Sequence, residues 1–313
     1  VNQFWFAWQT WRLTRQGFDV VHSHENTWHG DLQTVHVRPF RVGLFHNSQG
    51  LKRLFKCLSL CTSPRLLTYW CLETARFRPQ TRKHIIATST QVMEETLHAY
   101  PRMAACMQVI APGVNLPLVP IMPVAARRLL ALPQGVTLAL FVGNDYAKKG
   151  LATLLEALSH VPSLHLAVVG HGQHLSTFQH QAQQLQVADR VHFLGSLTDV
   201  SPAYAAADLL VHPTTEDTYA MVVLEAMAYG LPVVVSGTPY CGISAELNHN
   251  EQALILKDPR NAQVLGEEIT RLISTPQLIL QLKTNGQIFA RERSWQAVAA
   301  AHETLFQKVT QPT

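Results

Sequence analysis

Two carboxylates near a run of apolar residues are the side chains in this sequence best suited to bind a ligand. Asp217 lies in a polar segment, and Glu225 follows eight positions later among apolar residues whose helical spacing ends at Gly230. Near 3.6 residues per turn, this separation can place both side chains on one face of a helix. A carboxylate can accept two hydroxyl hydrogens at once, which makes the vicinal diols of a sugar its natural ligands. A helix-terminus acid followed by a solvated or paired acid would explain the same spacing.

Two predicted strands flank this helix and would position its carboxylates. Residues 208–212 and 231–236 are short apolar runs of the kind found in buried strands of a parallel sheet. Thr218 is the expected N-cap of the intervening helix. Because ligands of open α/β sheets bind beyond the carboxyl ends of the strands, the loop of residues 213–219 is the expected binding region.

A loop containing two lysines follows another predicted strand. Residues 138–142 form an apolar run, and Gly143 opens a loop that ends in Lys148, Lys149 and Gly150 before a predicted helix. Two cations at a helix N-terminus are a usual diphosphate site. The spacing does not fit a Walker A loop. Two surface lysines before a helix are also common where nothing binds.

Both segments resemble motifs of the retaining family 4 glycosyltransferases. Residues 225–232 are similar to the end of the family's E-x7-E segment and the Gly-x-Pro that follows it, and residues 143–150 are similar to its G-x-x-x-x-K/R-K-G loop. The family has Glu at the first acidic position, where this chain has Asp217 preceded by Glu216. Two alternatives therefore stay open: Asp217 acts with a shorter side chain, or Glu216 acts through a shifted loop.

The resemblance implies a role for each matching residue of these motifs. Lys148 and Lys149, between Gly143 and Gly150, would hold a nucleotide diphosphate. Glu225 would bind the ribose diol, and Asp217 would bind the donor hexose. These implied roles make the two acids candidate catalytic residues.

Two further segments match the family. Residues 19–24 resemble its D-V-V-H-x-H segment, which implies that His24 lies near the reacting sugar. Leu197 lies in a loop that resembles the one contacting the base, largely through backbone. The implied reaction is transfer of a hexose from a nucleotide diphosphate sugar to a glycolipid hydroxyl, with retention at the anomeric carbon. The chain contains no Asp-x-Asp pair, and neither a metal nor another cofactor is expected.

Basic residues are concentrated in the first part of the chain. Residues 1–128 contain 15 Lys and Arg against 6 Asp and Glu, whereas residues 129–313 contain 10 against 15. This excess suits an anionic partner, and a solvated basic face explains it equally well. Residues 51–83 are the expected contact with an anionic glycolipid acceptor or the anionic inner membrane, on its cytoplasmic face. No motif supports nucleic-acid binding.

Length and composition indicate a globular protein of two domains. The 313 residues are 47% hydrophobic and 15% charged, with no run of 18 apolar residues. Five scattered cysteines favour neither zinc nor a disulfide framework, so a reducing cytosol is the default. The aromatic-rich residues 4–15 are expected to form a core helix, in preference to an interfacial anchor. Because position 1 is Val, the first domain is expected to be incomplete at its start.

The alternation of strands and helices predicts two doubly wound α/β domains. The resemblance identifies them as the Rossmann-like domains of a GT-B fold facing across a cleft, closest in appearance to the bacterial lipopolysaccharide core glucosyltransferases. We expect an acceptor-side domain at residues 1–125, a nucleotide-sugar domain at 126–290 and a C-terminal helix at 291–313 that returns to the first domain. A catalytically silent nucleotide-sugar-binding protein and a GT-B nucleotide-sugar epimerase remain alternative functions.

Overall fold

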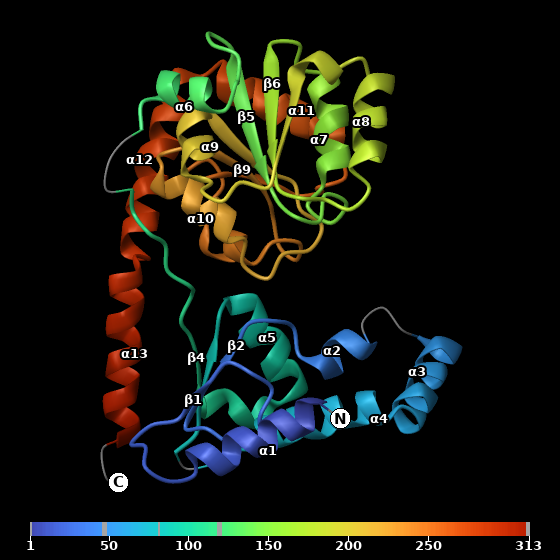
Figure 1. Cartoon of the computed structure of the whole chain (residues 1–313), viewed down its shortest axis with the longest axis vertical. Helices are drawn as coiled ribbons and strands as arrows, with labels where there is room; N and C mark the ends of the chain where they lie inside the picture. The colour runs from blue at the N-terminus through green and yellow to red at the C-terminus, as the bar shows by residue number, and fades with distance from the viewer. Residues whose placement is uncertain (1, 46–48, 81, 118–120, 311–313) are drawn as a thin grey trace. The chain divides into compact units, whose positions relative to one another are not determined.

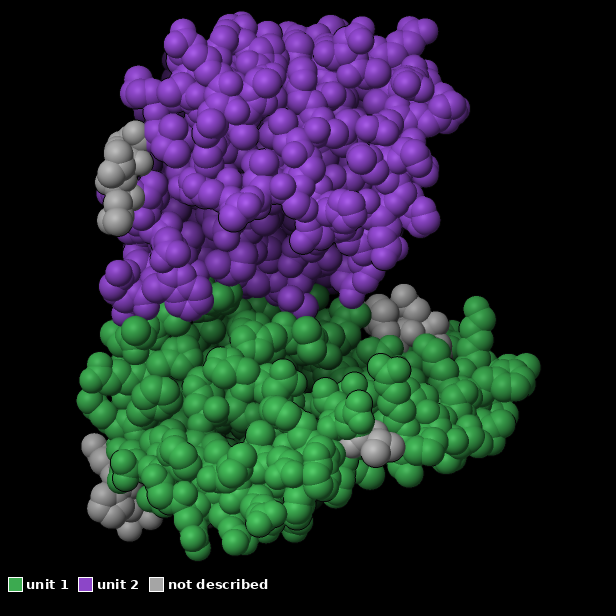
Figure 2. Space-filling view, in the orientation of Figure 1, with its two compact units in different colours: residues 1–112, 298–313 green, residues 113–297 purple. Residues whose placement is uncertain are grey.

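The chain folds as two compact units of α/β structure (Figures 1 and 2). The computed structural model describes residues 2–45, 49–80, 82–117 and 121–310. Unit 1 comprises Val1–Pro112 and Val298–Thr313, and unit 2 comprises Gly113–Ala297. The boundary expected after residue 125 therefore falls inside unit 2. The segment after Pro112 packs on unit 2, because Val114 forms an isolated parallel bridge with Ser294.

A parallel sheet forms the centre of unit 1. Within the described residues it has four strands in the order β1-β2-β3-β4. The strands are β1 His22–Ser23, β2 Leu32–Val35, β3 His84–Ala87 and β4 Met107–Val109. The helices are α1 Asn2–Thr14, α2 Phe40–Phe45, α3 Gly50–Thr62, α4 Pro64–Arg76 and α5 Thr90–Ala99, followed by a 3-10 turn at Pro101–Cys106. Leu32 and Ile86 of the sheet pack against Leu305 and Val309 of α13 (Trp295–Thr310), which begins in unit 2 and ends in unit 1.

The helix α1 differs from its predicted role in the core. Ala7 is its only buried residue, whereas Phe4, Trp5 and Leu13 are 55%, 58% and 72% exposed. Aromatic residues lie on several sides of this helix, and its contacts with α4 and of Phe4 with Trp28 do not cover them all.

A second parallel sheet forms the centre of unit 2. Its described strands have the order β10-β9-β8-β5-β6-β7. They are β5 Thr137–Val142, β6 Leu164–Val169, β7 Val191–Gly195, β8 Leu209–His212, β9 Val233–Ser236 and β10 Leu254–Leu256. The helices are α6 Pro123–Leu129, α7 Leu151–Ser159, α8 Leu175–Gln184, α9 Ser201–Ala206, α10 Met221–Ala228, α11 Ala262–Ile273 and α12 Pro276–Glu292. The strands predicted at 138–142, 208–212 and 231–236 are confirmed within one or two residues.

The central strands of this sheet are largely apolar and buried, which explains the continuous hydrophobic runs in the sequence, and the polar His212 and Ser236 stand only at the carboxyl ends of β8 and β9. All four residues of β8 and of β9 are buried, and β5 is buried at its four central positions. Helices α7 and α11 pack against each other beside the sheet. Because the strands are parallel, the loops after β5, β7 and β8 all leave from the same edge of the sheet.

Candidate functional site

An ion pair joins the loops that follow β5 and β8. The Lys149 ammonium donates to Asp217 Oδ2 at 2.5 Å, and these side chains are only 22% and 16% exposed. The fully buried His212, which ends β8, approaches the same oxygen through Nε2 at 3.2 Å. Burial opposes ionisation of Asp217, but the His212 hydrogen bond and the Lys149 charge outweigh it and hold the pKa of this carboxyl well below its ordinary value. Asp217 is therefore a carboxylate that fixes the position of Lys149.

His212 is a neutral partner in this cluster. Burial lowers the pKa of its imidazole, and the bond to Asp217 only partly offsets this effect. With Nε2 donating to the carboxylate, the buried Nδ1 has no hydrogen-bond partner among the described residues. His212 was not among the residues predicted from sequence, although its place at the carboxyl end of a buried strand is a signal that could have found it.

The backbone around Asp217 is also fixed on both sides. Its Oδ1 accepts from the backbone N–H groups of Tyr219 and Ala220 at 3.3 and 2.8 Å. Asp217 pairs with Cys241 in an isolated parallel bridge, and a Cβ built on Gly242 would lie 1.9 Å from the Thr218 carbonyl oxygen. The prediction of Thr218 as N-cap is wrong. The backbone turns at residues 217–220, where Asp217 accepts from Ala220, and this Asp217 turn delays the start of α10 to Met221. Ala220 is therefore the N-cap residue.

Glu225, on α10, is held by a different partner. The Tyr204 hydroxyl, on α9, donates to Glu225 Oε2 at 2.6 Å, and the Tyr204 ring stacks on Tyr229 with centroids 5.3 Å apart. Burial raises the pKa of the Glu225 carboxyl, and the Tyr204 hydrogen bond moderates the increase. No local pattern in the sequence indicates Tyr204, because its contact depends on the packing of α9 against α10.

The two predicted carboxylates do not lie on one helical face. Asp217 precedes α10 and bonds Lys149 and His212, whereas Glu225 lies within the helix and bonds Tyr204. The spacing argument assumed a helix through both positions, which the Asp217 turn prevents. In the described part of the chain the two side chains have different hydrogen-bond partners, so each presents its own carboxylate.

The lysine loop depends on a glycine at each end. Gly150 has φ +80°, and a Cβ built on it would lie 2.0 Å from the Pro213 carbonyl oxygen, so the loops after β5 and β8 touch there. A Cβ on Gly143 would lie 2.9 Å from Lys149 Cγ. Gly143 thus leaves room for the Lys149 side chain, and Gly150 is the N-cap residue of α7.

Lys148 and Glu216 form a more exposed pair beside this cluster. Their charged atoms lie 3.4 Å apart, and the side chains are 58% and 64% exposed. The Lys148 carbonyl oxygen accepts from the backbone N–H of Thr215 at 2.7 Å, which fixes the loop. Leu197 is half-buried in the loop after β7, at the same edge of the sheet. The structure therefore brings Lys148 and Lys149 together with Glu216 and Asp217 on adjoining loops.

His24 lies in unit 1, just after β1, and lines a hollow of about 470 Å³. Its Nδ1 lies 2.9 Å from Nε2 of His36, which follows β2. Burial, with the neighbouring His24, His302 and His36, lowers the pKa of His22 to about 4. Burial also lowers the pKa of His24 and His36, which keeps this cluster neutral near pH 7. His36 and His22 were not among the predicted site residues.

The described residues bear on two kinds of partner, metal ions and membranes. They contain no group of three His, Cys, Asp or Glu side chains placed to hold a metal ion. No described helix is both long and apolar enough to cross a bilayer. Metal-independent chemistry therefore stays a prediction that rests on the lysine loop.

The profile of the family described as "Glycosyl transferases group 1" matches residues 125–289, more than half of the chain. The chain belongs to the group 1 glycosyl transferases. The candidate site residues of unit 2 lie within this match, including Lys149, Asp217 and Glu225. The sequence-based assignment to a glycosyltransferase family is thereby confirmed.

Known group 1 transferases and their structures extend the comparison. The lipopolysaccharide glucosyltransferase WaaG of Escherichia coli is 28% identical over 71% of this chain and 61% of its own length. A D-inositol 3-phosphate glycosyltransferase of Streptomyces bingchenggensis is 27% identical over 95% of this chain and 68% of its own. The chain thus spans about three fifths of the length of WaaG.

Solved structures confirm the predicted GT-B class. A WaaG crystal structure matches with a TM-score of 0.79 at 22% identity, covering 97% of this chain and 82% of that one. Anabaena HepE in complex with UDP-glucose matches with a TM-score of 0.66 at 20% identity, covering 90% and 79%. At these identities the likeness concerns the fold of the group 1 transferases.

Proposed function

We propose that this protein transfers a hexosyl group from a nucleotide diphosphate sugar to a hydroxyl of a glycolipid acceptor, with retention at the anomeric carbon. The observation that carries the proposal is the ion pair in which Asp217 fixes the Lys149 ammonium, just before the start of α7. The relatives support the substrate class, since WaaG is named a lipopolysaccharide glucosyltransferase and HepE was crystallised with UDP-glucose. UDP-glucose is therefore the proposed donor, and lipopolysaccharide core the proposed acceptor.

Charge stabilisation is the main catalytic contribution of the loop. Departure of the diphosphate builds negative charge, which Lys149, Lys148 and the N–H groups of α7 would stabilise without a metal. Gly143 and Gly150 would let the diphosphate approach the backbone. A pre-positioned ammonium needs little reorganisation when the charge develops, and Asp217 supplies that positioning.

Glu225, Leu197 and His24 would complete the substrate contacts. The Tyr204 hydroxyl occupies one oxygen of the Glu225 carboxylate, so the ribose diol would bind through its remaining acceptor sites. The backbone at Leu197 would contact the base. His24 belongs to the histidine cluster that is neutral near pH 7. It would accept a hydrogen bond from a sugar hydroxyl or donate one to it.

Of the two acids at the first motif position, we assign the role to Asp217. Its carboxylate is largely buried against Lys149, whereas Glu216 is 64% exposed beside Lys148. Only an acid fixed in place can orient both a lysine and a sugar hydroxyl. Because Asp217 already accepts from Lys149, His212 and two backbone N–H groups, any bond to the hexose would use its remaining capacity.

The activity test uses UDP-glucose with a lipopolysaccharide core acceptor. We expect UDP release that requires acceptor in wild type and is lost in Glu225→Gln, with both proteins equally folded by thermal unfolding. Conversion of the donor without acceptor would identify an epimerase. Donor binding without any turnover would identify a silent binding protein.

Tyr204→Phe is expected to change the pH dependence of donor binding. Loss of the hydroxyl removes one hydrogen bond from Glu225, which should weaken UDP-glucose binding by about 0.5 to 1.5 kcal/mol at pH 8. Without this bond the pKa of Glu225 rises further above its ordinary value, so the variant should lose affinity at a higher pH than wild type as the pH falls. Calorimetry across pH measures this effect. Tyr229→Phe is the matched control, and identical profiles for all three proteins would refute the assignment.

A membrane contact through residues 51–83 is also part of the proposal, and the most exposed apolar side chains described in this segment lie on α3. Leu51, Leu54 and Phe55 of this helix are 60 to 70% exposed, interleaved with lysine and arginine. Two basic residues of the segment face inward: Arg76 donates to the Thr34 carbonyl oxygen, and Lys83 is 2% exposed. These exposures support the exposed face of α3 as the proposed contact surface.

Anionic vesicles test this surface. Leu54→Ser with Phe55→Ser should reduce co-sedimentation with phosphatidylglycerol vesicles at least about tenfold, because burying two such side chains contributes about 1.5 to 3 kcal/mol each. Leu280→Ser, which changes a 67% exposed leucine of α12, is the control. Equal sedimentation of the α3 and α12 variants would show that α3 is not the contact.

A further inference from the structure

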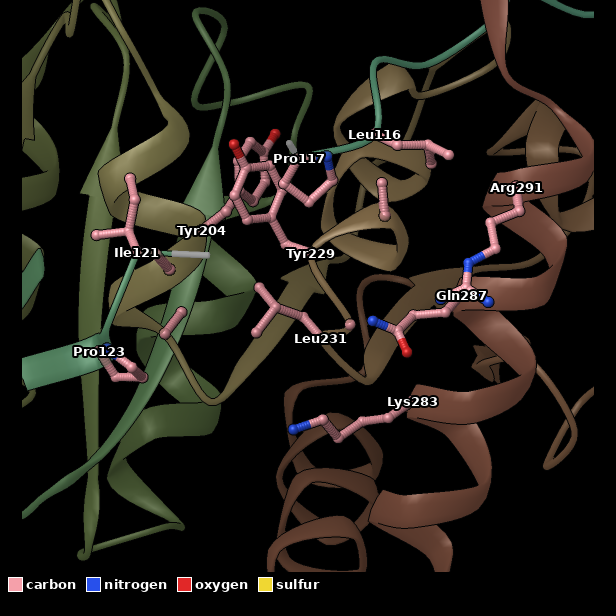
Figure 3. Close-up of a pocket in the computed structure, with 14 residues that line it drawn as sticks. Leu116, Pro117, Ile121, Pro123, Tyr204, Tyr229, Leu231, Lys283, Gln287 and Arg291 are labelled. Carbon is pink, nitrogen blue, oxygen red and sulfur yellow. The ribbon is translucent and has the colours of Figure 1, made fainter. Parts of the chain in front are cut away.

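A second hollow lies on unit 2, away from the lysine loop, with a volume of about 440 Å³ (Figure 3). Its walls come from Leu116, Pro117 and Ile121, from α9 and the end of α10, and from α12. Ala207 and Leu231 line it, and they precede the amino ends of β8 and β9. Because Lys149 and Asp217 lie at the opposite, carboxyl edge of the same sheet, this hollow is a separate site.

One wall of the hollow carries positive charge. Lys283, Gln287 and Arg291 recur every four residues along α12, and Figure 3 shows them on one side of the helix, facing Tyr229 and Leu231. Among the described residues, neither Lys283 nor Arg291 has an ion-pair partner, and none of those that line the hollow is acidic. At a rise of 1.5 Å per residue their Cα atoms are about 12 Å apart, which two long side chains can bridge by converging on one ligand.

The facing wall is aromatic and apolar. The stacked Tyr204 and Tyr229 rings lie beside Leu231, Ile121 and Leu116. Tyrosine rings offer a large apolar surface with little loss of conformational entropy on binding. A ligand that matches both walls has an anionic group for α12 and an apolar or planar body for the tyrosine side. A phosphate ester, which carries close to two negative charges at pH 7, satisfies both cations.

We propose that this hollow binds a small organic phosphate, with its phosphate on Lys283 and Arg291 and its body against Tyr229 and Leu231. Tyr204 lines the hollow and also donates a hydrogen bond to Glu225, the residue proposed to bind the ribose. An occupant of the hollow would therefore contact the side chain that orients Glu225. Occupancy is therefore expected to change donor affinity. This coupling rests on the proposed function, whereas the binding itself does not.

Calorimetry with phenyl phosphate tests the binding, using inorganic phosphate and phenyl glucoside as probes of charge alone and body alone. Wild type should bind phenyl phosphate more tightly than either. The double variant Lys283→Gln, Arg291→Gln should lose affinity at least about tenfold. Lys257→Gln, which changes an exposed lysine outside the hollow, should leave it unchanged. Thermal unfolding confirms that the variants, all on exposed side chains, remain folded.

Three outcomes would overturn the proposal. The first is no measurable binding of phenyl phosphate by wild type. The second is equal affinity for phenyl phosphate in the α12 double variant and in Lys257→Gln. The third is loss of binding in Lys149→Ala without loss in the double variant, which would place the ligand at the lysine loop of residues 143–150. No nucleotide sugar or acceptor enters these measurements, so their failure and failure of the transferase proposal are distinguishable.

Discussion

Lys149→Ala should lower kcat/KM for sugar transfer by about 100-fold or more, because it removes the fixed cation nearest to the departing diphosphate. It should also destabilise the fold by about 1 to 3 kcal/mol, since Asp217 then keeps a largely buried charge without its ammonium partner. Urea unfolding measures the second effect, and initial rates of UDP release measure the first.

A double variant separates these two effects. In Lys149→Ala, Asp217→Asn the unpaired charge is removed, so stability should return toward that of wild type while transfer stays lost. Recovery of both would mean that Lys149 acts only on folding. Lys148→Ala is the matched control for a neighbouring, exposed lysine, and a smaller loss of activity is expected.

The same carboxylate gives a stability change with a defined pH window. The pKa of Asp217 is depressed in the folded state, so its ionisation contributes stability that is present above the ordinary carboxyl pKa of about 4. The contribution is lost as the pH falls below that value. The stability difference between wild type and Asp217→Asn should therefore be constant near neutrality and narrow in acid.

Gly150→Ala should destabilise the protein by about 3 kcal/mol or more and abolish donor binding. Its Cβ would lie 2.0 Å from the Pro213 carbonyl oxygen, so the loops after β5 and β8 must separate, and the positive φ adds strain. Gly135→Ala is the matched control, because Gly135 has φ +71° with no atom within 4 Å of the added Cβ. It should cost only about 1 kcal/mol.

Equal destabilisation by these two glycine substitutions would contradict the contact between the loops. Urea unfolding of both variants decides this, with calorimetric binding of UDP as the second measurement. Loss of binding in Gly150→Ala alone would connect the loop contact to the site.

Local patterns predicted the sheet of unit 2 well and its side-chain contacts poorly. The apolar runs that became β5, β8 and β9 could be found because a parallel strand buried on both faces needs a continuous hydrophobic sequence. The roles of Asp217 and Glu225 were predicted from the resemblance to a family motif. That Asp217 would fold into a turn against Ala220, and so delay α10, depended on its bonds to the neighbouring backbone.

The partners of these acids required the tertiary structure. Tyr204 reaches Glu225 from another helix, and Lys149 reaches Asp217 across 68 positions of sequence. No periodicity encodes such pairs. Helix α1 was mispredicted for the same reason. Its many aromatic residues indicated a core helix, and only the tertiary structure shows that no neighbouring element among the described residues covers most of them.

The most direct test of the central claim is calorimetric binding of UDP and GDP to wild type and to Lys149→Ala at two salt concentrations. The proposed function predicts that UDP binds wild type, and that Lys149→Ala weakens binding by about 1 to 3 kcal/mol, with a smaller difference at high salt. If neither nucleotide binds wild type, or if both proteins bind UDP equally, the assignment of the Lys149 and Asp217 cluster as the donor site is wrong.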